Sequence, residues 1–326
     1  MSKKCIGCGA LLQSNYPNEI GYVNSSVYDR SLYCERCFRM IHYNERIELS
    51  LPNMNKVLLS KINKCNGFIY FMIDLLNINR ESMDTFKKIQ KDKCLVISKY
   101  DILPKSFQDQ KIIRMLEDEY GVDCNIIFLS TKKNISTNKI LRDVLNKGYN
   151  KVYFTGYTNS GKSTLLNKIL ENYHMNHHIT TSSNPNTTVD FIKVELDDIV
   201  IYDTPGFVFE HSLYDNDYQF VNKLFCKKEI KPITMQVKND GIVTIENMFY
   251  FTSKDCINYT FYMSNELSIQ KIFQNNFGNL EYQEYSIPRN SDIVIQGMGF
   301  INIKKECTIR IYSDYLYCIE IRKSMF

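Results

Sequence analysis

The sequence predicts an α/β protein built on a doubly wound, mostly parallel sheet, with a cysteine-rich module before it and a mostly β domain after it. Three observations support this fold class. Apolar runs alternate with polar, helix-compatible stretches between residues 51 and 210, as in a parallel sheet with crossover helices. Short runs of period-two alternation dominate residues 211–326, which is typical of antiparallel strands. Residues 1–50 hold two cysteine pairs but few apolar runs, so they cannot build a core unaided.

The central segment contains six runs that we expect to be strands. The first four are continuously apolar or nearly so, as buried parallel strands are. The last two are separated by Asp197 and Asp198, so we expect them to form a hairpin. The six runs are residues 67–73, 94–98, 125–129, 151–155, 189–196 and 199–202.

Two of the polar stretches between these runs, residues 106–120 and 137–147, are expected to be helices. The final segment should begin with a helix around residues 218–225 and continue with strand-like runs. Those runs are residues 230–237, 241–245, 259–263, 293–303 and 308–322. The 326 residues therefore divide into three expected domains: 1–50, 51–210 and 211–326.

The composition narrows the class of protein further. Hydrophobic residues make up 44% of the chain and charged residues 23%, as in a globular protein with a sizeable core. A net charge of +4 does not by itself predict nucleic-acid binding. The longest apolar stretch, residues 67–76, is interrupted by Asp74 and is too short to cross a bilayer. We therefore expect a cytoplasmic protein without a membrane partner, whose 11 cysteines are thiols or metal ligands rather than disulfides.

The string GYTNSGKS at residues 156–163 is a phosphate-binding loop motif. It follows the apolar run KVYFT and precedes the helix-compatible STLLNKIL, a context that a chance glycine-rich turn would not explain. In such loops the backbone N–H groups and the helix N-terminus cradle phosphates, the lysine reaches the β and γ phosphates, and the hydroxyl after it ligates Mg²⁺. The residues expected to bind nucleotide here are Gly156, Asn159, Ser160, Gly161, Lys162, Ser163 and Thr164.

A second phosphate motif, DTPG, follows the last apolar run of the central segment. Asp203 is expected to hold Mg²⁺ through water, and the Gly206 N–H to contact the γ-phosphate. Between the two motifs, Thr188 is expected to complete the Mg²⁺ shell together with Ser163 and Asp203. Thr187 is the alternative ligand, and an ordinary polar turn is the competing interpretation.

Two further motifs fit recognition of guanine. Ser98-Lys99-Tyr100-Asp101 ends an apolar run, where a GTPase usually has Asn-Lys-x-Asp. Asp101 can accept hydrogen bonds from guanine N–H groups, and the Lys99 stem can cover the base. Ser98 stands where Asn is usual, so we expect weaker guanine binding, by about 0.5–1.5 kcal/mol for one lost hydrogen bond. The next run is followed by a motif like Ser-Ala-Lys, whose residues are Ser130, Thr131 and Lys132.

Both base motifs precede the phosphate loop, whereas they follow it in an ordinary GTPase. Circular permutation explains this order, because a sheet brings strand ends together whatever their order in the chain. With CIGCG, CERCFR, CKKEIKP, FYMSNELSI and DIVIQGMGFINIK elsewhere, the chain resembles the circularly permuted GTPases of the YqeH type. The resemblance implies a switch protein that binds and hydrolyses GTP and assists assembly of the small ribosomal subunit through ribosomal RNA, ribosomal protein or both.

The residue after DTPG is Phe207, where Ras-like enzymes place the Gln that orients the attacking water. We therefore expect slow intrinsic hydrolysis. The resemblance implies that a potassium ion, held partly by Asn159, supplies charge at the γ-phosphate; a loop-stabilising role of Asn159 is the alternative. The expected catalytic residues are Lys162, Asn159 and Thr188.

The N-terminal cysteines form two C-x-x-C pairs, Cys5 with Cys8 and Cys34 with Cys37. Four thiolates at such a spacing can surround one structural Zn²⁺, which would let a short segment fold without a core. A redox pair is the alternative. We interpret the histidines of residues 174–178 as surface residues rather than metal ligands, and the basic run 227–231 as a solvated charge cluster.

Two other functions stay open at this point. A P-loop kinase or ATPase would share the phosphate motifs but not the use of Asp101. An RNA- or protein-binding scaffold with a weak nucleotide site would not need Lys162, Ser163 and Asp203 together.

Overall fold

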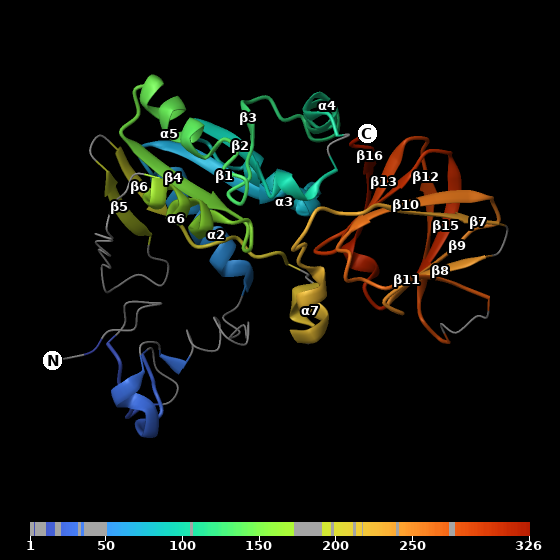
Figure 1. The fold of residues 1–326 in the computed structure, drawn as a ribbon, viewed down its shortest axis with the longest axis horizontal. Coiled ribbons are helices and arrows are strands. Elements are labelled where there is room, and N and C mark those ends of the chain that lie inside the picture. Colours follow the sequence, from blue (N-terminus) through green and yellow to red (C-terminus); the bar gives the residue numbers. More distant parts are fainter. Residues whose placement is uncertain are drawn as a thin grey trace.

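The computed structural model contains an α/β domain and a β domain that pack side by side, with a small N-terminal part beside the α/β domain (Figure 1). The structure describes residues 3, 11–16, 21–31, 34–35, 51–104, 107–172, 191–196, 199–210, 213–216, 218–238, 241–273 and 278–326. Among these residues, no helix is long and apolar enough to cross a membrane.

The α/β domain is built on one six-stranded sheet in the order β3-β2-β1-β4-β6-β5. All neighbours are parallel except β5, which pairs antiparallel with β6, so the predicted α/β sheet and its final hairpin are both confirmed. The strands are β1 (Phe68–Asp74), β2 (Lys93–Ser98), β3 (Ile126–Phe128), β4 (Lys151–Gly156), β5 (Ile192–Leu196) and β6 (Ile199–Asp203).

Alternate side chains of each central strand enter different cores. In β1, Ile69 and Phe71 belong to one apolar cluster, whereas Tyr70 and Met72 belong to the other. This is the period-two alternation of a strand covered on both faces. It explains why the run FIYFMID reads as continuously apolar.

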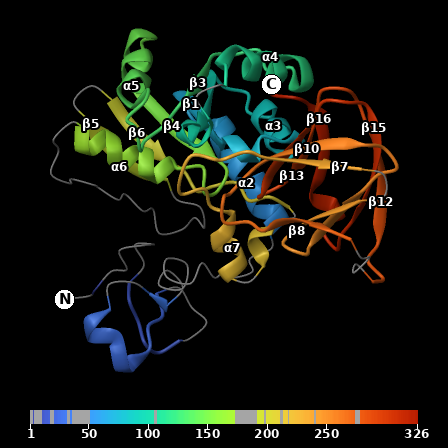
Figure 2. The same ribbon diagram turned by 45° about the vertical axis from the view of Figure 1, so that its right-hand side comes forward.

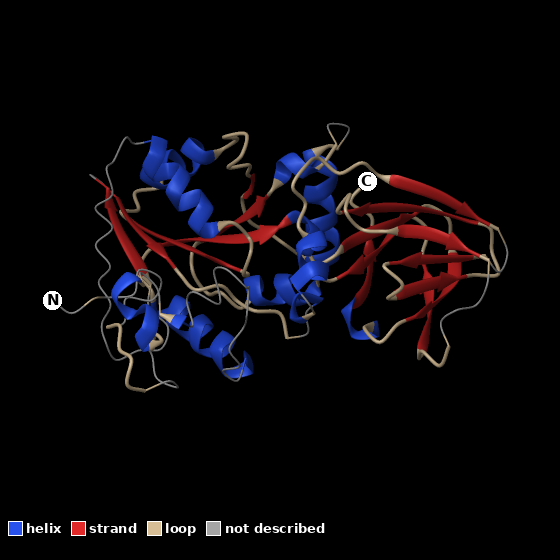
Figure 3. Cartoon of the chain, turned by 60° about the horizontal axis from the view of Figure 1, so that its bottom comes forward, coloured by secondary structure: helices blue, strands red, loops and turns tan. Residues whose placement is uncertain are grey.

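Helices cover the two faces of the sheet (Figure 3). The first cluster contains side chains of α2, α3 and α4, and the second contains those of α5 and α6. Predicted helices 106–120 and 137–147 correspond to α4 and α5, each within a few residues. The helices are α2 (Leu51–Lys64), α3 (Arg80–Lys87), α4 (Asp109–Tyr120), α5 (Thr137–Asn146) and α6 (Lys162–Asn172). Short 3-10 turns are η1 (Ser25–Arg30), η2 (Leu75–Asn77), η3 (Tyr100–Ile102), η4 (Leu213–Asp215) and η5 (Leu316–Cys318).

The β domain contains two five-stranded antiparallel sheets, in the orders β16-β13-β14-β10-β7 and β11-β8-β9-β15-β12. It follows α7 (Tyr218–Leu224), close to the predicted helix, and the prediction of a mostly β region is confirmed. Its strands are β7 (Ile233–Val237), β8 (Ile242–Ile245), β9 (Phe249–Thr252), β10 (Ile257–Met263), β11 (Ile269–Ile272), β12 (Tyr282–Ile287), β13 (Ser291–Ile295), β14 (Gly299–Ile303), β15 (Cys307–Tyr312) and β16 (Ile319–Lys323).

Two of the predicted strand runs are in fact pairs of strands. Residues 293–303 form the β13–β14 hairpin, whose turn contains Gly297 at φ +85 and is followed by Gly299 at φ +137. Both values lie in the region that glycine tolerates best. Residues 308–322 likewise divide into β15, η5 and β16. Gln296-Gly297 and Ser313-Asp314 mark the two turns, but the strand-like pattern resumes soon after each and conceals them.

The two domains share one core. The cluster that lies over β1 and β2 also contains Val294, Phe300 and Met325 of the β domain. Arg322 and Asp292 are fully buried beside this cluster, 3.6 Å apart, and Arg322 donates a hydrogen bond to the Ile78 carbonyl after β1. Figure 2 shows β13 and β16 on the side of the β domain that faces α3 and α4. The β domain is therefore packed against the α/β domain rather than tethered to it.

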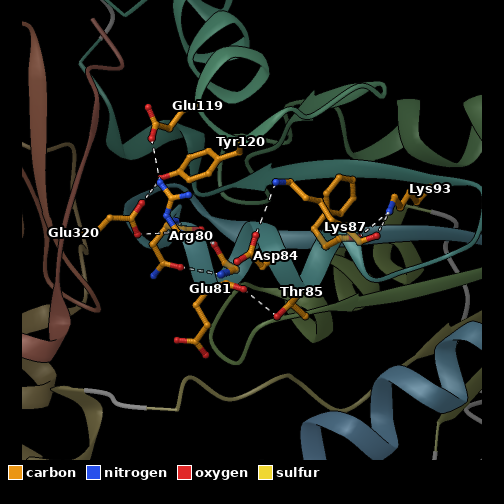
Figure 4. Close-up of polar contacts among 12 residues, drawn as sticks. Arg80, Glu81, Asp84, Thr85, Lys87, Lys93, Glu119, Tyr120 and Glu320 are labelled. Carbon is orange, nitrogen blue, oxygen red and sulfur yellow. Dashed lines mark hydrogen bonds and ion pairs between the residues drawn. The ribbon is translucent and has the colours of Figure 1, made fainter.

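Helix α3 and the end of α4 carry polar contacts across this boundary (Figure 4). Glu320 of β16 accepts hydrogen bonds from the Arg80 N–H at 2.7 Å and from the Tyr120 hydroxyl at 2.8 Å. Glu81 bridges two other segments, because it accepts from the Glu210 N–H at 3.1 Å and from the Gln296 side chain at 3.1 Å. The first turn of α3 is thus bonded to the β domain, through Glu320 and Gln296, and to the segment after β6, through Glu210.

Candidate nucleotide site

The phosphate-loop motif lies where the sequence places it, between β4 and α6. β4 ends at Gly156, whose φ is +136, and a Cβ there would lie 2.0 Å from the Met72 carbonyl oxygen. Only glycine fits so close to the neighbouring strand. Asn159 and Gly161 also have positive φ, +62 and +88. The loop therefore curls tightly before α6 begins at Lys162.

Lys162 is folded back into this curl. Its side chain is 7% exposed, and Nζ donates to the carbonyl oxygens of Gly156 at 3.2 Å and Tyr157 at 2.7 Å. Burial lowers the pKa of Lys162 to about 8, against the opposing influence of the Asp203 charge. A buried amine bonded only to neutral carbonyls gains from an anion placed beside it.

Ser163, at the start of α6, contacts Asp203, the last residue of β6. The Ser163 hydroxyl donates to Asp203 Oδ2 at 2.8 Å. Burial raises the pKa of Asp203, while the Ser163 hydrogen bond and Lys162 act to lower it. Asp203 Oδ1 is buried and has no hydrogen-bond partner among the described residues. A hydroxyl and a carboxylate with a spare oxygen are ligands that Mg²⁺ accepts, so these two residues fit the predicted magnesium site.

The other residues of the loop differ in their solvent exposure. Ser160 is fully buried and its hydroxyl donates to the Tyr157 carbonyl at 2.7 Å. Asn159 and Thr164 are exposed, so their side chains are open to a ligand. The predicted switch threonines, Thr187 and Thr188, lie outside the described residues.

The DTPG motif is bonded directly to the phosphate loop. The Phe207 N–H donates to the Gly156 carbonyl at 2.9 Å, and the Thr158 N–H donates to the Phe207 carbonyl at 2.8 Å. A Cβ on Gly206 would lie 2.8 Å from the Thr158 backbone nitrogen. Backbone hydrogen bonds therefore hold the two phosphate motifs against each other, in addition to the side-chain contact between Ser163 and Asp203.

Phe207 points into the core. It is 1% exposed, and its ring centroid lies 5.9 Å from that of Tyr157 and 6.1 Å from that of Phe71. A side chain in this position cannot reach a water molecule at a bound phosphate. The expectation that Phe207 does not replace the Gln of Ras-like enzymes agrees with this geometry.

The two base motifs also come together, at the ends of β2 and β3. Ser130 donates to Asp101 Oδ1 at 2.6 Å and accepts from the Lys133 N–H at 3.0 Å. Ser98 is 3% exposed and donates to the Ile73 carbonyl of β1 at 3.1 Å. Thr131 and Lys132 follow in the turn after β3, and Lys132 is exposed. Ser98 therefore ties β2 to β1 and does not reach the loop after β3.

Lys99 has a partner that sequence reasoning missed. Its backbone is left-handed, with φ +56, and its Nζ bonds to Asp74 at the end of β1. Burial is the largest single influence and lowers the pKa of Lys99, but the Asp74 charge and hydrogen bond, with Tyr214 and Cys226, together outweigh it, so the pKa is raised. The available signal was a carboxylate directly after six apolar residues, FIYFMI; such a charge at a strand end in an open α/β sheet faces the ligand edge.

The predicted zinc ligands cannot be brought together from the described residues. Cys34 is 1% exposed and packs with Leu12 and Val23, while Cys5, Cys8 and Cys37 lie outside the described residues. Among the residues that are described, no group of three His, Cys, Asp or Glu side chains could hold a metal ion. Residues 174–178, with their histidines, also lie outside this part of the chain.

Comparison with known proteins agrees with the site. Residues 151–256 match the family model described as "50S ribosome-binding GTPase". The chain is 28% identical over 341 residues to "Uncharacterized protein YqeH" of Bacillus subtilis (strain 168), and the match covers 92% of each protein. The chain is therefore similar to YqeH along nearly its whole length and contains a GTPase domain.

A more distant relative, "Putative nitric oxide synthase" of Oryza sativa subsp. japonica, is 22% identical over 246 residues, or 64% of this chain and 45% of that protein. The GTPase domain binds GTP and GDP with Mg²⁺ and hydrolyses GTP. The phosphate loop and DTPG both lie within the matched residues, whereas the base motifs lie before them.

Proposed function

We propose that this protein is a circularly permuted GTPase whose nucleotide cycle assists assembly of the small ribosomal subunit. One observation carries the permuted site. The strand order brings the carboxyl ends of β2, β3, β4 and β6 to one edge of the sheet, although the base motifs come first in the chain. Ligands bind at that edge in open α/β sheets.

Within this site we assign the residues as follows. Backbone N–H groups of the loop, with Lys162, bind the β and γ phosphates, and Ser163, Asp203 and Thr188 hold Mg²⁺. Asp101 reads the guanine N–H groups, and Lys99 and Lys132 flank the base. The support is the arrangement of Ser163 on Asp203 at 2.8 Å and of Ser130 on Asp101 at 2.6 Å.

A potassium ion assists hydrolysis in this proposal. Phe207 is buried in the core, whereas Asn159 is exposed in a left-handed turn of the phosphate loop. An amide oxygen at that place is a ligand for a monovalent cation near the γ-phosphate. Turnover measured in KCl should exceed turnover in NaCl at equal ionic strength; equal rates would remove potassium from the mechanism.

A structural zinc ion organises the N-terminal module in this proposal, with Cys5, Cys8, Cys34 and Cys37 as ligands. The support is the spacing of the two C-x-x-C pairs and the burial of Cys34. Metal analysis of the purified protein should find about one zinc per chain. Absence of zinc from protein purified without chelators would contradict it.

The ribosomal role has its own test. Purified small and large subunits are centrifuged separately with the full chain in GDP, in a non-hydrolysable GTP analogue, and without nucleotide. We expect nucleotide-dependent co-sedimentation with the small subunit. The family description that matches residues 151–256 names the 50S subunit, so binding to the large subunit alone would redirect the proposal. Binding to neither subunit would overturn it.

A further inference from the structure

Residues 225–231, here called the strap, connect α7 to β7 and run past both base motifs. Their sequence, FCKKEIK, is strongly basic, and sequence reasoning treats it as a solvated run. Its four charged residues are indeed exposed, but Cys226 is half-buried and Ile230 is 2% exposed. Burial raises the pKa of the Cys226 thiol to about 12. The strap is therefore packed along the protein rather than free in solvent.

The strap contacts the first base motif at Lys99, and it also contacts Ile102, the residue directly after the motif. The Phe225 ring lies under Lys99, with 6.0 Å from Nζ to the ring centroid. The same ring stacks on Tyr214 at 5.7 Å, with an angle of 8° between the planes. Further along, the Ile230 N–H donates to the Ile102 carbonyl at 2.7 Å. Lys99 is thus held between Asp74 on one side and an aromatic face on the other.

The strap also contacts the second base motif. Lys132 Nζ donates to the Lys227 carbonyl at 2.9 Å. The strap therefore touches both lysines whose stems flank the base in the proposed guanine site. Neither contact involves the phosphate loop.

The other side of the strap is fixed to the β domain. Asn265, in the turn after β10, accepts from the Lys231 N–H at 2.8 Å and donates to the Glu229 carbonyl at 2.9 Å. Glu266 in the same turn pairs with Lys227 at 3.1 Å. The turn after β10 thus sets the path of the strap, and the strap touches the lysines.

We propose that the strap is the back wall of the guanine pocket: it positions Lys99 and Lys132, so guanine-nucleotide affinity depends on the β domain. The inference rests on the proposed assignment of Lys99 and Lys132 to the base. Phe225 and Asn265 are positioning residues that act through these lysines. Phosphate binding and hydrolysis, which use β4 and β6, do not depend on them.

The test uses the full chain with Mg²⁺ and measures the Kd for GDP by calorimetry and kcat and KM for GTP. Phe225→Ala should raise the Kd and KM about two- to fivefold, the usual size of one lost cation–π contact. Because the base is held equally in the ground and transition states, kcat should stay unchanged. Phe225→Tyr keeps the aromatic face and should restore wild-type affinity. Asn265→Ala should raise the Kd in the same direction by freeing the strap.

Phe273→Ala is the matched control, since Phe273 is 98% exposed on the β domain and should leave both constants unchanged. In a Lys99→Met background, Phe225→Ala should add little, because residues that act through one contact are not additive. Full additivity would show that Phe225 does not act through Lys99, and would overturn the inference. So would a wild-type Kd in both Phe225→Ala and Asn265→Ala, or a fall in kcat that matches the rise in KM. Wild-type protein that fails to bind GDP would instead refute the proposed function.

Discussion

The part of the site proposed to bind the phosphates and the part proposed to bind the base, here called the phosphate side and the base side, are held by different kinds of contact. On the phosphate side, Gly156, Thr158 and Phe207 hold two motifs together through backbone hydrogen bonds, and Lys162 and Asp203 are buried. On the base side, a backbone hydrogen bond from Tyr100 to Leu129 joins the two strand ends, but Asp101 and Lys99 are placed by side-chain contacts, to Ser130 and Asp74. Backbone geometry needs nothing from outside the sheet, whereas a side-chain pocket depends on its neighbours. Substitutions on the two sides should therefore change different constants.

The largest expected effect is on the phosphate side. Lys162→Met removes the buried amine at the proposed γ-phosphate site, and kcat for GTP should fall about 10²–10³-fold, as when one preorganised charge donor is lost. Lys168→Met, later on the same helix and paired with Glu171 at 3.0 Å, is the control and should keep wild-type turnover. Undiminished kcat in Lys162→Met would show that the phosphate side does not supply the catalytic charge.

The lowered pKa of Lys162 also predicts that the free energy of unfolding depends on pH. Its pKa is lowered by burial to about 8 from 10.5, so between these values the unfolded chain binds more protons than the native one. The free energy of unfolding of nucleotide-free protein should therefore rise with pH through this window, by about 3 kcal/mol in total. Denaturant titrations at pH 8 and 10 should show a smaller rise in Lys162→Met, because other titrating groups are common to both proteins. Parallel curves would contradict the lowered pKa.

On the base side, Asp101→Asn should change the choice of base without changing hydrolysis. The amide cannot accept from the guanine N–H groups as the carboxylate does, so affinity for GDP should fall about 10- to 100-fold, the size of a lost charged hydrogen bond. Affinity for XDP should rise at the same time. Competition binding with GDP, XDP and ADP measures both. An unchanged preference would favour a P-loop kinase or ATPase over a GTPase that reads guanine with Asp101.

The smallest expected effect concerns Ser98. Its hydroxyl reaches only the Ile73 carbonyl of β1, at 3.1 Å, whereas a longer amide can also reach the loop after β3. Ser98→Asn should tighten GDP binding by up to about tenfold, the value of one added hydrogen bond. Ser98→Ala tests whether the present hydroxyl contributes, and should weaken GDP binding slightly. Weaker binding in Ser98→Asn would mean that the buried position has no room for the amide.

The features of this molecule that could be predicted are those whose sequence pattern lies within one short segment of the chain. The strands β1 to β4 and β6 are apolar or nearly apolar runs, and each motif follows one, so the edge that brings Lys162, Asp203 and Asp101 together could be predicted from the sequence. The β13–β14 turn was hidden because the strand-like pattern resumes directly after Gln296 and Gly297. The role of residues 225–231 was also hidden, because their partners, Lys99 and Lys132, lie far earlier in the chain. Thr188, Cys5, Cys8 and Cys37 remain predictions, since they lie outside the described residues.

The shared core between the domains has a consequence for synthesis. Met325 is fully buried in the cluster over β1 and β2, and Arg322 bonds to the Ile78 carbonyl just after β1. Because a chain is made from its N-terminus and domains usually fold in that order, β1 and β2 must wait for partners translated some 250 residues later. Truncated nascent chains that end before β16 should therefore expose an apolar face of the α/β domain to chaperones. Folding of the α/β domain is therefore coupled to translation of β16 and of the residues that follow it in the shared core.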